Sequence, residues 1–198
     1  MAGKIAPSDN PKAALRAQVI AARDALPAAA RREHAARITQ QLLELDAYRN
    51  AACMLAYISF GSEFDTGALV ADALARGKKL CLPRVDRATH NLEIYCVEDL
   101  ERDLQAGAWG IREPRTGCLS ADLDRIDFVL VPGVAFTPRC ERLGYGRGYY
   151  DRLIANFARR PPLVAAAFAL QVHDEIPLTA NDQRVDIVVT ENSFYCNC

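Results

Sequence analysis

The chain has 198 residues, of which 51% are hydrophobic and 25% are charged, and this size and composition are typical of one globular domain with its own core. Its 24 basic and 25 acidic residues give a formal net charge of −1, which argues against broad nucleic-acid binding, because that requires a basic excess. No apolar run reaches the roughly 18 residues needed to span a bilayer.

The first half of the chain alternates helical and strand patterns. Apolar residues at helical spacing predict helices over residues 11–25, 27–46 and 66–76. Asn10 and Pro11 suit the N-cap and first position of the first helix, and Gly77 suits the end of the third. Short apolar runs predict strands over residues 53–58, 79–85 and 92–97.

The second half begins with a long segment, residues 98–124, in which glycines and prolines predict mostly loop. A loop of this length in a compact domain indicates a functional role. Further apolar runs predict strands over residues 128–133, 162–169 and 186–191, and a helix is predicted over 149–157. Alternating helices and apolar strands predict an α/β sheet covered by helices on both faces.

Seven cysteines are scattered along the chain, at positions 53, 81, 96, 118, 140, 196 and 198. Cys53, Cys81 and Cys96 fall in apolar strand-like runs, which favours small buried side chains over disulfide partners. Cys196 and Cys198 form a C-x-C pair, but a zinc site requires four ligands and no further pair lies nearby.

The most informative segment is RLGYGRGYYD, residues 142–151. Its alternating glycines, Gly144, Gly146 and Gly148, allow sharp turns that expose backbone N–H groups, and the helix that follows adds the positive end of its dipole. Arg142 and Arg147 add full positive charges. The segment therefore predicts a phosphate-binding loop, although its spacing matches neither a P-loop nor a dinucleotide fold. A structural glycine-rich turn or an RNA contact remains open on the residues alone.

With VPGVAF before it, this segment resembles the signature of the 5-formyltetrahydrofolate cyclo-ligase family, also called methenyltetrahydrofolate synthetases. Five more blocks resemble the family in the same order, over nearly the whole chain: PKAALR with Lys12 and Arg16, SFGSEFDT with Glu63, LPRV, AWGIREP with Trp109, and NDQRVDIVVTE with Asp182 and Asp186. Two positions depart from the family: Thr137 replaces an acidic residue and Cys140 replaces a glycine. Both precede the glycines and bear on the shape of the loop before them.

The resemblance implies a three-layer α/β/α sandwich with a mixed, mainly parallel sheet, similar to the sugar-phosphate isomerase and CoA-transferase type. It also implies ATP-dependent conversion of 5-formyltetrahydrofolate to 5,10-methenyltetrahydrofolate, with Mg²⁺ and release of ADP and phosphate. The formyl oxygen is a poor leaving group, so phosphorylation of that oxygen would precede attack by N10. The expected partners are reduced folate and ATP, with no nucleic acid and no membrane.

The resemblance also implies site residues. The ATP-binding residues would be Lys12, Arg16, Arg142, Leu143, Gly144, Tyr145, Gly146, Arg147, Gly148, Tyr149 and Tyr150. The substrate-binding residues would be Ile58, Glu63, Trp109, Tyr145, Gly146, Arg147, Gly148 and Tyr149. Arg142, Arg147 and Tyr149 would be catalytic, and Asp151 and Asp182 would bind the metal, with Asp186 as an alternative to Asp182.

Each of these assignments has a structural alternative on the residues alone. Lys12 and Arg16, one helical turn apart, also fit a solvated helix face. Asp151 fits a first-turn aspartate that complements the helix dipole, and Asp182 fits a turn. Glu63 fits a solvated helix entry.

Two other functions remain open: a sugar-phosphate isomerase or acyl-CoA transferase that binds phosphate without hydrolysing ATP, and a non-catalytic nucleotide or RNA binder. The start of the sequence, MAGKIAPSDN, has no apolar signal-peptide core. We therefore expect a cytoplasmic monomer with one domain over residues 1–198, of which residues 1–10 are a flexible N-terminus.

Overall fold

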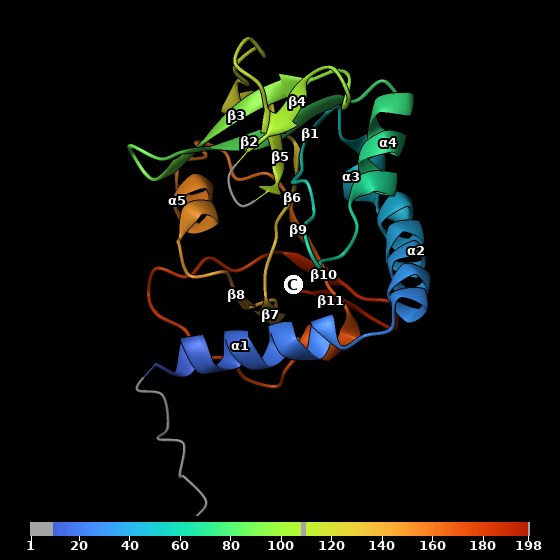
Figure 1. Cartoon of the computed structure of the whole chain (residues 1–198), viewed down its shortest axis with the longest axis vertical. Helices are drawn as coiled ribbons and strands as arrows, with labels where there is room; N and C mark the ends of the chain where they lie inside the picture. The colour runs from blue at the N-terminus through green and yellow to red at the C-terminus, as the bar shows by residue number, and fades with distance from the viewer. Residues whose placement is uncertain (1–9, 108–109, 198) are drawn as a thin grey trace, which may run out of the picture.

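The computed structural model describes residues 10–107 and 110–197, and it is built around a seven-stranded sheet (Figure 1). The strand order is β11-β10-β9-β6-β1-β2-β3, in which the five strands from β10 to β2 are parallel and both edge strands are antiparallel. The strands are β1 (Cys53–Leu55), β2 (Lys79–Asp86), β3 (Asn91–Val97), β6 (Phe128–Leu130), β9 (Leu163–Ala166), β10 (Ile187–Val189) and β11 (Phe194–Cys196). The predicted mixed, mainly parallel sheet is confirmed.

The two faces of this sheet are covered by different helices. The helices α2 (Ala28–Glu44), α3 (Asp46–Asn50) and α4 (Gly67–Ala75) lie on one side, and α5 (Tyr149–Ala155) lies on the other (Figure 1). Successive side chains of a strand point to opposite faces. In β1, Met54 accordingly packs with Leu42 of α2, whereas Leu55 packs with Leu153 of α5. The predicted three-layer arrangement follows from this alternation.

Helix α1 (Pro11–Asp24) lies across one end of the molecule (Figure 1, blue). Asn10 caps it as predicted, because its side chain accepts a hydrogen bond from the backbone N–H of Ala13 at 3.1 Å. Val19 of α1 packs in a separate apolar cluster with the short antiparallel strands β7 (Ala135–Phe136) and β8 (Arg142–Leu143). This packing brings α1 beside the segment that leads into the glycine-rich loop.

Some predicted boundaries were wrong. The predicted helix over residues 27–46 is broken at Leu45, whose extended backbone separates α2 from α3. The predicted loop over residues 98–124 contains a hairpin of β4 (Leu104–Ala106) and β5 (Arg112–Pro114) and a 3-10 turn at Leu123–Arg125. The strands β7, β8 and β11 were not predicted, because two or three residues give no detectable alternation.

The two departures from the family pattern lie in the turn between β7 and β8. Cys140 has φ of 59°, in the left-handed region where glycine is favoured, which agrees with the glycine that the family usually has there. At the other position, the Thr137 hydroxyl donates to Glu141 Oε2 at 2.9 Å, a polar contact within the turn. The turn therefore closes without either family residue.

The cysteine prediction is confirmed for two of the three residues that it named. Cys53 and Cys81 are thiols buried in the core, whereas Cys96 is half-buried. No helix in the described ranges is both long and apolar enough to cross a membrane.

Candidate active site

Two neighbouring cavities lie on either side of the glycine-rich loop. One, of about 400 Å³, is lined largely by apolar side chains, and we call it the apolar cavity. The other, of about 670 Å³, is lined mainly by polar groups, and we call it the polar cavity. Gly144, Gly148 and Asp151 line both cavities, so the loop forms the wall between them.

The loop has the backbone geometry that its glycines predicted. Gly146 and Gly148 have φ of 96° and 67°, which a residue with a Cβ rarely adopts. A Cβ on Gly146 would also lie 3.2 Å from the Arg16 guanidinium. Helix α5 begins directly after Gly148, so Tyr149, Tyr150 and Asp151 are placed by this turn.

The polar cavity is bounded by α1, the glycine-rich loop and the segment around Asp182. Lys12 and Arg16 both line it, as their spacing on one helix face predicted. The Arg16 Nε donates to the carbonyl oxygen of Gly144 at 2.7 Å, and the Lys12 ammonium forms an ion pair with Asp182. The cavity therefore combines the cations of Lys12 and Arg16 with backbone of the glycine-rich loop, and Arg152 also lines it.

Asp182 serves first to hold Lys12. Its Oδ2 accepts from the Lys12 ammonium and from the backbone N–H of Thr179, the latter at 2.5 Å. Burial alone would raise the pKa of Asp182, but the Lys12 and Thr179 hydrogen bonds outweigh it and hold that pKa below its ordinary value. Asp182 is thus an ionised carboxylate on the wall of the polar cavity.

Asp151 is held by a buried arginine. Its Oδ1 accepts from Arg142 Nη2 at 2.5 Å and from the backbone N–H of Gln183 at 3.0 Å. Arg142, 3% exposed, also donates to the carbonyl oxygens of Pro132 at 3.1 Å and Gln183 at 3.3 Å. Three of the five N–H donors of Arg142 therefore contact protein groups, and the residue joins three segments that surround the site.

The two aspartates suit a magnesium ion to different degrees. Magnesium in nucleotide sites is held by one or two carboxylates together with phosphate oxygens. Asp151 accepts both of its described hydrogen bonds at Oδ1, which leaves Oδ2 for a metal, whereas the Oδ2 of Asp182 is engaged by Lys12 and Thr179. Asp186 lines neither cavity and bonds to Leu163 and Arg160, so the structure does not place it with the other two.

The apolar cavity contains one buried acid, Glu63, which is 7% exposed. Its Oε2 accepts from the backbone N–H of Phe60 at 3.0 Å and its Oε1 from the hydroxyl of Tyr145. Burial raises the pKa of Glu63 above its ordinary value, while the two hydrogen bonds and the nearby Arg23 oppose that rise. The sequence-based expectation that Glu63 and the glycine-rich loop share one rim of the sheet is confirmed.

Tyrosines and aliphatic residues form the rest of the apolar cavity. Ile58 and Tyr149 line it as predicted. Tyr150, predicted to bind ATP, lines this cavity and not the polar one, and its hydroxyl is buried without a hydrogen-bond partner among the described residues. Arg147 is exposed and lines this cavity, not the polar one. Trp109 lies outside the described residues. Several other residues that line this cavity were not predicted as site residues, although they lie in the LPRV and AWGIREP blocks that resemble the family. These are Leu82, Pro83, Val85, Ile111, Arg112 and Glu113.

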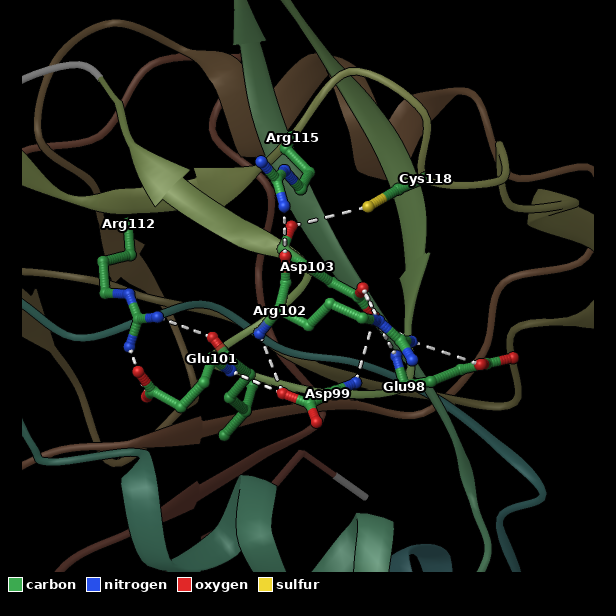
Figure 2. A network of polar contacts seen from close by, with 9 residues as sticks. Glu98, Asp99, Glu101, Arg102, Asp103, Arg112, Arg115 and Cys118 are labelled. Carbon is green, nitrogen blue, oxygen red and sulfur yellow. Dashed lines mark hydrogen bonds and ion pairs between the residues drawn. The ribbon is translucent and has the colours of Figure 1, made fainter.

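One wall of the apolar cavity comes from the β4–β5 hairpin, because Ile111, Arg112 and Glu113 line it. Arg112 extends from this hairpin to Glu101 Oε1 at 2.9 Å and to the carbonyl oxygen of Leu100 at 2.6 Å (Figure 2). The hairpin is thus tied to the segment that precedes it.

Asp103 is the centre of the polar network that holds this hairpin (Figure 2). Its carboxylate accepts from the side chain of Arg102 at 2.7 Å and from the backbone N–H groups of Glu98 and Asp99 at 3.0 Å each. These bonds, the Arg102 contact foremost, hold the pKa of Asp103 well below its ordinary value. Its carbonyl oxygen accepts from the backbone N–H of Arg115 at 2.9 Å. The described part of the long segment is therefore held together by polar contacts, and residues 111–113 form a wall of the site.

Comparisons with known proteins point to one family. The model of the 5-formyltetrahydrofolate cyclo-ligase family matches residues 8–191. The 5-formyltetrahydrofolate cyclo-ligase of Mycolicibacterium smegmatis is 31% identical over 92% of this chain and 95% of its own length. The mouse protein of the same name is 27% identical over 93% of this chain and 96% of its own. An NMR structure of Aquifex aeolicus 5,10-methenyltetrahydrofolate synthetase, 32% identical, matches with a TM-score of 0.84 over 95% of this chain and 93% of its own.

Proposed function

The chain belongs to the 5-formyltetrahydrofolate cyclo-ligase family, and from that premise we propose that it converts 5-formyltetrahydrofolate to 5,10-methenyltetrahydrofolate with hydrolysis of ATP to ADP and phosphate. The observation that carries this proposal is the pair of cavities that share one wall. A reaction that transfers a phosphoryl group between two substrates requires two sites with their reacting ends in contact. The apolar cavity suits a flat heterocycle, and the polar cavity suits a triphosphate.

Glu63 is the group that would recognise the pterin. Phe60 and Tyr145 each occupy one acceptor position on its carboxylate, which has about four such positions in all. Both oxygens can therefore still accept from the two N–H groups on the aminopyrimidinone edge of a folate, a charge-assisted bidentate contact. Ile58 and Tyr149 line the same cavity and would contact the faces of the rings.

The triphosphate would lie in the polar cavity against Lys12, Arg16 and the backbone of Gly146 and Gly148. Phosphoryl transfer depends on positioning and on neutralising phosphate charge, which the two cations provide. Asp151, on the wall shared with the apolar cavity, would hold a magnesium ion whose charge offsets that of the phosphates.

The chemistry of ring closure explains why ATP is required. The N10 amine must replace the formyl oxygen, and an amide-type oxygen is a poor leaving group. Transfer of the γ-phosphoryl group to that oxygen makes it leave as phosphate when N10 attacks the formyl carbon. The buried, unpartnered hydroxyl of Tyr150 lines the apolar cavity and is suited to donate a hydrogen bond to the substrate.

An absorbance assay tests this function. The product contains a conjugated amidine, so protein, 5-formyltetrahydrofolate, ATP and Mg²⁺ together should give a new near-ultraviolet absorbance and one ADP per product. Omission of ATP should abolish the gain. No gain with all components present would exclude the cyclo-ligase, and a gain without ATP would exclude the phosphorylation step.

Lys12→Ala should weaken ATP binding and leave folate binding intact. Loss of one charged hydrogen bond to phosphate is worth about 1.5–3 kcal/mol, so the KM for ATP should rise roughly 10- to 150-fold. Steady-state kinetics with each substrate varied in turn measures the effect. The matched control is Lys79→Ala, an exposed lysine at the opposite end of the parallel strands. A variant with an unchanged KM for ATP would remove Lys12 from the triphosphate site.

Folate binding should weaken as the pH falls. The Glu63 carboxyl accepts two N–H groups only when ionised, and burial raises its pKa above the ordinary value of 4.5, so it is protonated at a higher pH than an exposed glutamate. Calorimetric titration with 5-formyltetrahydrofolate, without ATP, between about pH 4 and pH 8 measures this effect. The affinity should decrease as the pH drops below the raised pKa of Glu63. A dissociation constant that is constant across this range would contradict the assignment of Glu63.

A further inference from the structure

Helix α1 presents two arginines to the glycine-rich loop. Arg16 and Arg23 are seven residues apart, close to two helical turns, and so project from the same side of the helix. Arg16 Nε donates to the carbonyl oxygen of Gly144 at 2.7 Å, and Arg23 Nη1 donates to the hydroxyl of Tyr145 at 3.1 Å. One helix therefore holds two consecutive residues of the loop.

The burial of Arg23 requires an explanation of its own. It is 3% exposed and lines neither cavity, so it is not placed to touch either substrate. Its hydrogen bonds within the described residues go to two hydroxyl groups, those of Tyr145 and of Ser62 at 3.0 Å. Arginine is seldom buried in this way without a carboxylate partner. The two hydroxyls that accept from Arg23 each donate to a carboxylate, Ser62 to Asp24 and Tyr145 to Glu63.

The direction of the hydrogen bonds connects Arg23 to Glu63. A guanidinium can only donate, so the Tyr145 oxygen accepts from Arg23 and its own proton must go elsewhere. The Tyr145 hydroxyl donates that proton to Glu63 Oε1. Arg23 thus fixes the orientation of a hydroxyl that in turn fixes a carboxylate.

We propose that Arg23 is a positioning residue, which acts through the Tyr145 hydroxyl to orient the Glu63 carboxylate that faces the apolar cavity. This inference rests on the proposed function only in that Glu63 binds the folate. Arg23 itself touches no substrate. Arg23 also donates a hydrogen bond to Ser62, the residue before Glu63, and so contacts the same segment at a second point.

A consequence of this arrangement is that the Tyr145 hydrogen bond and the Arg23 charge oppose the rise that burial causes in the pKa of Glu63. The charged and titratable groups that face it are Arg23 from α1, Tyr57 after β1, Tyr145 in the glycine-rich loop and Tyr150 of α5. Among them Arg23 carries the positive charge, and Tyr145 donates the side-chain hydrogen bond. Removal of either should favour the protonated carboxyl.

The test is the titration of the Glu63 carboxyl by ¹³C NMR in the full-length protein, assigned with Glu63→Gln. Arg23→Met and Tyr145→Phe should each raise the midpoint by about one pH unit, a tenfold change in the acid dissociation constant. Arg23→Lys should shift the midpoint less, because lysine keeps the positive charge although it lacks the planar guanidinium. Arg37→Met, at an exposed position of α2, is the matched control and should leave it unchanged.

Kinetics provides the second readout. Arg23→Met should raise the KM for the folate about tenfold and leave the KM for ATP within about twofold. Unshifted titration midpoints in both Arg23→Met and Tyr145→Phe would overturn the proposal, even if the enzyme is active. A shifted midpoint in a protein without cyclo-ligase activity would overturn the proposed function and leave the positioning role intact.

Discussion

Glu63→Gln should lower kcat/KM for 5-formyltetrahydrofolate by roughly 10²- to 10⁴-fold, from the loss of two charge-assisted hydrogen bonds of about 1.5–3 kcal/mol each. Glutamine keeps one acceptor oxygen but presents an amide N–H₂ group where the carboxylate accepted a second N–H. The buried position of Glu63 leaves little water to compensate for that mismatch.

The loss should appear on the folate side alone, because Glu63 lines only the apolar cavity. The KM for ATP should stay within about twofold of the wild-type value. Glu113→Gln is a suitable control, since Glu113 lies on the hairpin wall of the same cavity and has no assigned contact with the pterin. Equal losses in the two variants would mean that general charge, and not the Glu63 contact, governs folate binding.

Arg142→Met should lower the free energy of unfolding by roughly 2–4 kcal/mol. Breaking a fully buried ion pair costs about 3–5 kcal/mol, and the effect is smaller here because Asp151 keeps 20% of its side chain exposed. The variant also loses the bonds to the carbonyl oxygens of Pro132 and Gln183. Activity should fall with it, since Asp151 loses the contact that fixes its position.

Urea unfolding measures this effect, with Arg139→Met as the control, because Arg139 lies three residues away and is exposed. The family resemblance assigns Arg142 to phosphate instead, and that role predicts weaker ATP binding with stability intact. An unfolding free energy within about 1 kcal/mol of the wild-type value would favour the phosphate role over the structural one.

Features set by local sequence were predictable. The Asn10 cap, the left-handed glycines Gly146 and Gly148, and the alternation of helices and buried strands each depend on residues close in the chain. The shared rim of Glu63 and the glycine-rich loop was also predictable, because β1 and β6 are neighbouring parallel strands whose carboxyl ends lie at one edge.

Features set by distant contacts were not predictable. Arg23 is a charged residue on a helix, a pattern that favours a solvated face, and only the fold shows that Tyr145 and Ser62 cover it. Lys12 pairs with a residue 170 positions away. The structure likewise gives Arg142 a packing role beside the predicted phosphate role, because its three partners come together only in the folded chain.

The two substrates should occupy the two cavities on either side of the glycine-rich loop. A crystal structure of the ternary complex with 5-formyltetrahydrofolate and a non-hydrolysable ATP analogue would show where each one binds. The pterin should lie against Glu63 in the apolar cavity and the triphosphate against Lys12 and Arg16 in the polar cavity, with the γ-phosphate and the formyl oxygen meeting beside Gly148 and Asp151. A triphosphate bound in the apolar cavity, or a pterin without contact to Glu63, would contradict this arrangement.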